Sequence, residues 1–207
     1  YEEEPEDPSL YSSILLAQNA QTVDEEELFR AHQGYARLFD RVPRYTDHAP
    51  HAHEKIRVGY ISPDFRRNVL QHFVQPLLMG YDRARFEVYA YSTTETPDEV
   101  TAALRPHVTV WRDLGGAAPE EIRIHCDAID ILVDLAGHAA HGALPVLARR
   151  PAPVQMMGLG YMATSGLPEV DAFLTDEACD PVGGASEKYF TERLIRLPSQ
   201  FVYVPRA

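Results

Sequence analysis

The 207 residues include 45% hydrophobic and 24% charged side chains, enough for one globular core with a helical segment attached. The formal net charge of −12 argues against binding to nucleic acid or to an anionic membrane, because such binding uses clusters of Lys and Arg. The two cysteines, Cys126 and Cys179, are too far apart to suggest a disulfide framework or a thiolate zinc site, and no run approaches the ~18 apolar residues of a membrane helix.

The chain begins with an acidic, Pro-containing stretch, residues 1–9, which we interpret as a solvated lead-in. Such a start is the opposite of a signal peptide, so we expect a cytoplasmic protein. The first residue is Tyr rather than Met, and the last residues follow a strand-like run. Together these features lead us to expect a piece of a longer protein.

Residues 10–40 have the pattern of two helices. Ser9 is a candidate cap for a helix that begins near Leu10, and Asp24 is a better N-cap because acidic residues fill the turn after it. Apolar side chains then recur at helical spacing, at Leu28, Ala31, Tyr35, Leu38 and Phe39. We therefore predict a helical segment over residues 1–42, the end of a repeat array or a lead-in to the next domain.

The pattern changes twice after this segment. Residues 43–54 lack periodicity, which indicates a linker. Short β-rich runs then alternate with helical ones, with strands predicted at 56–62, 86–92, 108–111, 129–135, 154–159 and 172–175, and helices at 69–80, 98–104, 119–127 and 142–149. This alternation predicts a doubly wound α/β domain with a parallel sheet over residues 55–207.

In such a sheet, ligands gather at the carboxyl ends of the strands. The first strand end, residues 62–72, places the carboxylate of Asp64, two arginines and His72 at a helix N-terminus, whose free N–H groups favour anions. A plain helix start with exposed arginines fits the same spacing, so both interpretations stay open.

The second strand end, residues 134–142, is a loop of small residues with two imidazoles. His138 or His141 could donate hydrogen bonds or exchange protons near neutral pH. Two histidines three residues apart, without a third ligand, are more often ordinary loop residues, and the same holds for the linker histidines, His48, His51 and His53. We therefore predict no metal site.

The third strand end, residues 149–166, leaves a strand through a glycine-rich loop with hydroxyl side chains. Such a loop could cradle a sugar or a phosphate. A Gly-x-Gly pair alone is also a common turn, and the chain has neither a G-x-G-x-x-G motif nor a P-loop. The residues by themselves indicate an α/β domain with a polar rim.

In this order, the strand-end segments resemble the O-linked N-acetylglucosamine transferase and SPINDLY-like family. The resemblance covers about residues 10–203, and its matching stretches are 57–66, 86–92, 129–138, 148–155, 159–161 and 164–166. It implies the Rossmann-like N-terminal half of a GT-B fold, preceded by the last helices of a tetratricopeptide repeat region. Catalysis would occur in a cleft with a second half, which supplies most nucleotide contacts and an essential lysine.

The activity that this resemblance implies is transfer of N-acetylglucosamine, with inversion, from UDP-N-acetylglucosamine to Ser or Thr of acceptor proteins. It implies no cofactor besides the nucleotide sugar. Transfer of fucose from GDP-fucose, as in SPINDLY-like relatives, and a non-catalytic protein-binding module are the alternatives.

The resemblance also suggests roles for single residues. It implies catalytic roles for Asp64, His72 and Tyr11, and substrate binding by Asn68, His138, Leu159, Gly160, Tyr161 and Thr164. Asn68 and Tyr11 stand where relatives carry His, and Met162-Ala163 replaces a usual Pro-Gly. An Asn amide cannot move a proton, and a Tyr with a pKa of about 10 does so poorly. Loss of one general base lowers the rate by roughly 10²–10⁴, so we expect that this member uses other groups or is weak or specialised.

Overall fold

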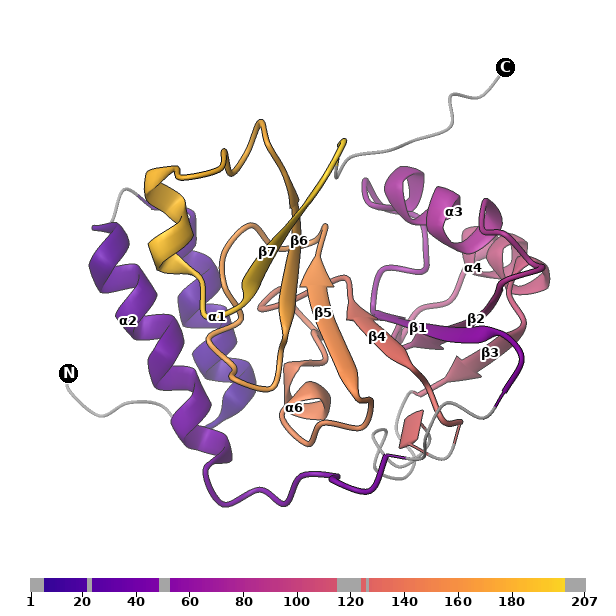
Figure 1. Cartoon of the computed structure of the whole chain (residues 1–207), viewed down its shortest axis with the longest axis horizontal. Helices are drawn as coiled ribbons and strands as arrows, with labels where there is room; N and C mark the ends of the chain where they lie inside the picture. Colours follow the sequence, from indigo (N-terminus) through magenta and orange to yellow (C-terminus); the bar gives the residue numbers. More distant parts are fainter. Residues whose placement is uncertain (1–5, 22–23, 49–52, 115–123, 126, 200–207) are drawn as a thin grey trace.

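A parallel β-sheet forms the centre of the fold. The computed structural model describes residues 6–21, 24–48, 53–114, 124–125 and 127–199. Within these residues seven strands pair in the order β3-β2-β1-β4-β5-β6-β7, and every pair is parallel (Figure 1). They are β1 (Ile56–Ser62), β2 (Phe86–Ser92), β3 (Val110–Asp113), β4 (Ile131–Asp134), β5 (Val154–Gly158), β6 (Ala172–Asp176) and β7 (Arg193–Leu197).

Helices cover both faces of this sheet (Figure 1). On one face, α3 (Gln71–Met79) and α4 (Glu99–Leu104) pack on strand residues such as Val88 and Val133. On the other face, α1 (Pro8–Asn19), α2 (Glu25–Tyr35) and α6 (Leu144–Leu147) pack on Ile61, Met157 and Phe173. Short 3-10 turns follow α2 (η1, Ala36–Phe39), follow α4 (η2, Arg105–His107) and precede β7 (η3, Ala185–Tyr189). The predicted doubly wound, Rossmann-like α/β fold is confirmed.

The residues that cap α1 and α2 explain where these two helices begin. The carboxylate of Asp24 accepts the N–H groups of Glu26 and Glu27 at 3.0 and 3.1 Å, so the predicted cap of α2 is confirmed. The predicted cap of α1 is wrong: Asp7 accepts the N–H of Leu10 at 2.8 Å, and Ser9 lies inside the helix. Proline is favoured at the first helical position, and Pro8 there moves the start two residues upstream.

The strand predictions are confirmed for β1 to β6, with ends shifted by up to two residues. β7 was not among the predicted strands; its sequence Arg-Leu-Ile-Arg-Leu mixes charge into a short edge strand. Most of the helix predicted at 119–127 lies outside the described residues. The helix predicted at 142–149 is shorter, because Pro145 stands in its first turn and Arg150 adopts a left-handed φ of 52°.

Candidate functional site

The carboxyl ends of β1, β4 and β5 lie next to one another at one edge of the sheet. The chain runs from β1 outward to β3, then returns to the other side of β1 to form β4. In open α/β sheets ligands bind outside the carboxyl ends of the strands at such a reversal of strand order. Asp64, His138 and Leu159 follow these three strands, so the structure places the three predicted strand ends along one rim.

Asp64 is the ionisable residue of this rim that follows β1. Its backbone N–H donates to Ser62 Oγ at 3.0 Å, and its Oδ1 accepts a hydrogen bond from Asn68 Nδ2 at 2.5 Å. Burial raises the pKa of the half-buried Asp64 carboxyl, opposed by the charge of Arg66, the Asn68 bond and the charge of His141. A carboxylate with a raised pKa accepts a proton more readily, as a general base must.

The segment between Asp64 and α3 also serves as a helix start, the alternative that the sequence left open. Asn68 Oδ1 accepts the N–H of Gln71 at 3.1 Å, and Arg67 forms an ion pair with Glu99 of α4. His72, in the first turn of α3, is exposed. Its Nε2 lies 3.5 Å from Nε2 of the Gln71 side chain. The contacts show the helix start, while ligand binding at this strand end and a catalytic role for His72 stay predictions.

The loop after β4, residues 135–142, is called the β4 loop below, and a buried carboxylate shapes its first turn. Asp134 is 0% exposed and accepts the backbone N–H groups of Ala136 and Gly137, both at 3.0 Å. Burial raises the pKa of Asp134 to about 7, against the opposing effect of these two bonds. The side chain thus titrates near neutral pH although it does not reach solvent.

His138 fixes the β4 loop to its neighbours. Its Nε2 lies 2.9 Å from the carbonyl oxygen of Ser165, which can only accept, so Nε2 carries the proton. Nδ1 then accepts from the hydroxyl of Ser12 in α1 at 2.9 Å. Burial, followed by the neighbouring His32, lowers the pKa of His138 to about 3. At neutral pH this imidazole is uncharged and engaged at both nitrogens, which fits a structural role better than proton transfer.

The loop after β5, residues 159–166, is called the β5 loop and packs against the β4 loop. Leu159 is nearly buried and adopts a left-handed φ of 76°, an uncommon backbone conformation for a branched side chain. At Gly160 a Cβ atom would lie 2.1 Å from the carbonyl oxygen of Leu135, so no side chain fits there. The two loops therefore form one packed unit at the rim.

A buried carboxylate that sequence reasoning missed holds the far end of the β5 loop. Glu192, just before β7, accepts the hydroxyl of Thr164 at 2.6 Å and the N–H of Ser165 at 2.7 Å, and also the Ser165 hydroxyl. Thr164 is 1% exposed, and its hydroxyl also lies 2.8 Å from Thr191 Oγ1. Glu192 lies 28 residues from Thr164 in sequence, and no local motif signals the pairing.

His32 of α2 is the second residue that sequence reasoning missed. Its Nε2 lies 2.8 Å from the hydroxyl of Tyr161 in the β5 loop, and its Nδ1 lies 2.7 Å from the carbonyl oxygen of Leu28. The only sequence signal was its place in the apolar stripe of α2, four residues after Leu28. Burial lowers the pKa of His32, opposed by the hydrogen bond to Leu28, and so favours the neutral ring.

A pocket of about 300 Å³ opens between the β4 loop and the first turns of α1. Ser9, Ser12 and Ser13 line it, together with the exposed His141. His141 adopts a left-handed φ of 61°, and its carbonyl oxygen accepts the hydroxyl of Thr93 at 3.3 Å. Since the charge of His141 also acts on Asp64, the pocket and the carboxylate belong to one region of the rim.

Tyr11, by contrast, is buried inside the helical pair. Its hydroxyl donates to the carbonyl oxygen of Ala31 at 3.1 Å, and its ring packs edge-on against Tyr35 at 5.6 Å. This geometry supports a structural role in the contact between α1 and α2. A catalytic role for Tyr11 stays a prediction.

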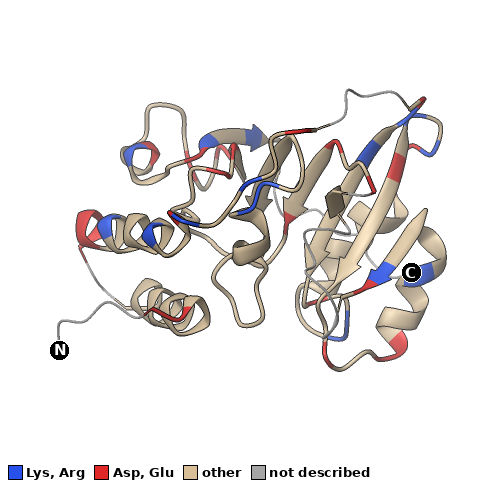
Figure 2. Cartoon of the chain, turned by 90° about the horizontal axis from the view of Figure 1, so that it is seen from below, with Lys and Arg blue, Asp and Glu red and all other residues tan. Residues whose placement is uncertain are grey.

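The described surface carries both signs of charge. Figure 2 shows acidic and basic residues interspersed along the described chain. Within the described residues, no three His, Cys, Asp or Glu side chains gather closely enough to hold a metal ion. Among the same residues, no helix has the length and apolar character needed to cross a membrane.

Comparison with known sequences gives a consistent result. The sequence model of glycosyl transferase family 41 matches residues 36–204. A protein of Arabidopsis thaliana named probable UDP-N-acetylglucosamine–peptide N-acetylglucosaminyltransferase SPINDLY is 37% identical over 191 residues, 87% of this chain and 21% of that protein. A Caenorhabditis elegans UDP-N-acetylglucosamine–peptide N-acetylglucosaminyltransferase is 32% identical over 72% of this chain and 13% of that protein.

Comparison with solved structures agrees with the sequences. The structure of a Thermobaculum terrenum O-GlcNAc transferase mutant superposes with a TM-score of 0.83 at 31% identity, covering 92% of this chain and 38% of that one. The chain thus spans about a fifth of the length of the SPINDLY relatives that it matches.

Proposed function

Because the chain belongs to glycosyltransferase family 41, we propose that its rim is one wall of a sugar-transfer cleft. The proposed reaction moves N-acetylglucosamine from UDP-N-acetylglucosamine to a Ser or Thr hydroxyl of an acceptor protein. The single observation that carries this proposal is the meeting of the β1, β4 and β5 ends at the strand-order reversal, with Asp64 on the rim. The names of the N-acetylglucosaminyltransferase relatives support the choice of donor.

The proposed chemistry is a direct displacement with inversion at the sugar carbon. The acceptor oxygen forms a bond to the anomeric carbon while the bond to the diphosphate breaks, and the acceptor hydroxyl loses its proton. Asp64 is our candidate to receive that proton, because burial raises its pKa and Asn68 orients Oδ1. Positioning of donor and acceptor in line supplies much of the remaining acceleration. We propose that a second domain closes the cleft and contacts the nucleotide. The cytoplasmic location expected from the sequence stays a prediction.

Transfer of fucose from GDP-fucose is the second candidate. The resemblance to SPINDLY-like proteins implies this donor, whereas the names of the SPINDLY relatives, at 32–37% identity, specify UDP-N-acetylglucosamine. Both candidates use the same wall and the same type of displacement. The mass of the group added to an acceptor separates them.

The full-length protein that contains this chain tests the proposal directly. It is incubated with a cell lysate and either UDP-N-acetylglucosamine or GDP-fucose, and modified peptides are identified by mass spectrometry. Label on Ser or Thr from one donor is the expected result. Stable capture of partner proteins with no transfer from either donor contradicts the proposal and favours a non-catalytic binding module.

The variant Asp64→Asn tests the proposed base. We expect kcat to fall by roughly 10²–10⁴, because the amide cannot accept the proton. In the wild-type protein, activity should decline as the pH falls through a pKa above the ordinary carboxyl range, since the base must be ionised. Asp113→Asn is the matched control: it removes a carboxylate from the end of β3, where Asp113 binds Arg105 and Trp111. Equal losses in both variants would remove Asp64 from the mechanism.

A further inference from the structure

His32 joins the helical pair to the β5 loop through a hydrogen bond of fixed direction. The carbonyl oxygen of Leu28 can only accept, so Nδ1 of His32 carries the proton. In the neutral ring Nε2 is then an acceptor, and the Tyr161 hydroxyl must donate to it at 2.8 Å. Both partners are buried, with His32 at 0% and Tyr161 at 2% exposure. The Leu28 contact therefore fixes the tautomer of His32, and that tautomer fixes the direction of the Tyr161 hydroxyl.

The backbone of His32 supports the other end of the same loop. At Gly166, which has a left-handed φ of 74°, a Cβ atom would lie 2.0 Å from the carbonyl oxygen of His32. The side chain of His32 thus contacts the start of the β5 loop, and its backbone contacts the end. His138 binds Ser165 in the same loop and packs edge-on against His32, with ring centroids 5.3 Å apart.

An apolar pair could fill this volume without hydrogen bonds, since replacing both partners of a buried polar contact by apolar groups is often nearly neutral for stability. The hydrogen bond between His32 and Tyr161 is directional, whereas an apolar contact is not. It therefore favours one orientation of the Tyr161 ring. Leu159, Gly160 and Thr164 lie on the same loop, on either side of Tyr161 in the sequence, and the family resemblance implies that they line the donor sugar. Displacement of a binding group by about 1 Å can lower a rate by roughly 10²-fold.

We propose that His32 is a positioning residue: from α2 it holds Tyr161, and with it the β5 loop, in the conformation that receives the donor sugar. This inference rests on the proposed function, because the loop positions a sugar only if the protein transfers one. His32 does not touch the reacting atoms and acts through Tyr161.

Four variants of the full-length protein test this role. His32→Leu removes the acceptor, His32→Gln keeps a side-chain oxygen that can accept from Tyr161, and Tyr161→Phe removes the donor. The double variant His32→Leu, Tyr161→Phe measures whether the two residues act as one unit. We expect kcat/KM for the nucleotide sugar to fall by roughly 10- to 100-fold in His32→Leu and Tyr161→Phe, with an unchanged KM for the acceptor. The double variant should lose no more than His32→Leu, and His32→Gln should retain more activity.

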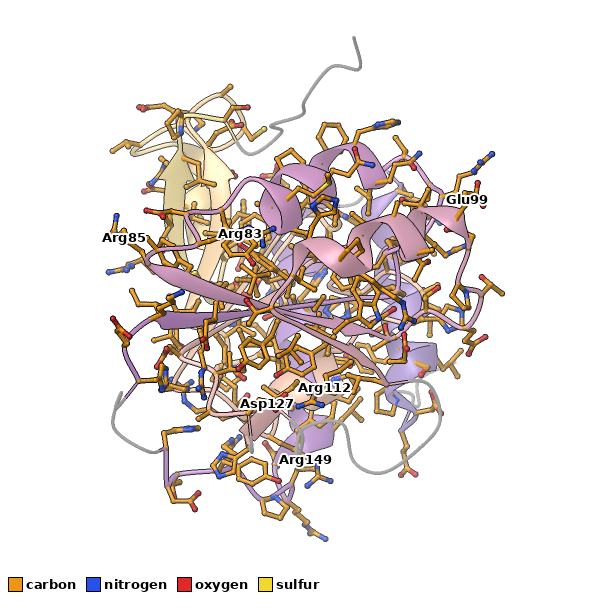
Figure 3. All side chains as sticks on the ribbon, turned by 90° about the vertical axis from the view of Figure 1, so that its right-hand side faces the viewer. Arg83, Arg85, Glu99, Arg112, Asp127 and Arg149 are labelled. Carbon is orange, nitrogen blue, oxygen red and sulfur yellow. The ribbon has the colours of Figure 1, made fainter. Side chains whose placement is uncertain are left out.

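Tyr91→Phe is the matched control for loss of stability. Tyr91 is also fully buried, and its hydroxyl donates to Asp127 Oδ2 at 2.8 Å. Asp127 precedes β4 and binds Arg112 at 2.7 Å; Figure 3 shows these two side chains close together at the lower side of the sheet. This control removes the same phenol hydroxyl away from the β5 loop, so kcat/KM should stay close to wild type. A loss equal to that of Tyr161→Phe would assign the effect to general destabilisation.

Amide hydrogen exchange of the β5 loop separates this inference from the proposed function. We expect faster exchange over residues 159–166 in His32→Leu and Tyr161→Phe, and not in Tyr91→Phe. If wild-type protein transfers no sugar, the proposed function fails, and faster exchange still shows that His32 holds the loop. Unchanged exchange in both variants, or wild-type kcat/KM in Tyr161→Phe, overturns the positioning role.

Discussion

Asp134, the last residue of β4, and His138, in the β4 loop, are both buried and ionisable, and their contributions to stability depend on pH in opposite directions. Burial raises the pKa of Asp134 to about 7 and, together with His32, lowers the pKa of His138 to about 3. The folded protein therefore favours both side chains in their neutral forms. Stability contributed by Asp134 declines as the pH rises from about 4 to 7, whereas that contributed by His138 declines as the pH falls from about 6.5 to 3.

The variant Asp134→Asn tests the first of these effects. The unfolded chain loses the Asp134 proton near pH 4, while the folded protein keeps it up to about pH 7, so deprotonation destabilises the wild-type fold above pH 4. From pH 5 to pH 8, we expect the stability of Asp134→Asn relative to wild type to increase by about 2 to 3 kcal/mol. The measurement is urea unfolding of both proteins at the two pH values. His138 titrates in both proteins, so its effect cancels, and an equal difference at pH 5 and pH 8 would contradict the raised pKa.

Among the secondary-structure elements, those with strong periodicity were predictable from the sequence. β1 and β2 were predicted at their observed residues, and the acidic turn after Asp24 identified the start of α2. β7 and the order of the strands in the sheet could not be predicted in this way, because they depend on contacts between residues far apart in the chain. The same holds for the candidate site: Asp64 followed from its place after a strand, but His32 and Glu192 act through partners 129 and 28 residues away.

The contact between the β5 loop and the start of β7 gives a prediction about stability. Glu192 accepts three hydrogen bonds from Thr164 and Ser165. Glu192→Ala would remove the acceptor of the Ser165 N–H and hydroxyl, and would leave Thr191 Oγ1, at 2.8 Å, as the remaining hydroxyl partner of Thr164. We expect a loss of about 3 kcal/mol in the free energy of unfolding, and a smaller loss in Glu192→Gln. Urea unfolding measures both.

The control for this prediction is Glu26→Ala. Glu26 pairs with Arg30 on the exposed side of α2, and such surface pairs contribute about 0–1 kcal/mol. If Glu192→Ala changed stability as little as Glu26→Ala, the carboxylate would not be the support of the β5 loop that its contacts indicate.

For the molecule as a whole, the helical pair and the sheet share one core. Tyr11, Leu15 and Tyr35 of the helices are buried in the same cluster as Ile61 and Met157 of the strands. The described part of the linker also lies against the domain, with the N–H of Tyr45 donating to the carbonyl oxygen of Arg149 at 2.9 Å. We therefore expect the helices and the sheet to unfold together.

Leu15→Ala tests this expectation. Leu15 is 0% exposed in α1, so the variant should lose about 2–5 kcal/mol of stability. Trp111 is the single tryptophan of the chain, and it lies in β3, at the opposite end of the sheet from the helical pair (Figure 1). Its fluorescence should report the shifted transition at the same denaturant concentration as circular dichroism.

Leu10→Ala, on the exposed side of the same helix at 55% exposure, should shift the transition little. If Leu15→Ala instead produced an early dichroism change with an unshifted Trp111 transition, the helical pair would be an independent unit.

The bonds from His32 to Tyr161 and from Ser12 to His138 limit how this protein can be recombined with its relatives. A chimera joined within residues 43–54 would look natural in sequence, yet it would separate each helical partner from the loop side chain that it binds. An exchange of helices should succeed only when the donor sequence brings side chains compatible with Tyr161 and His138, so the helical pair and the two loops should be exchanged together.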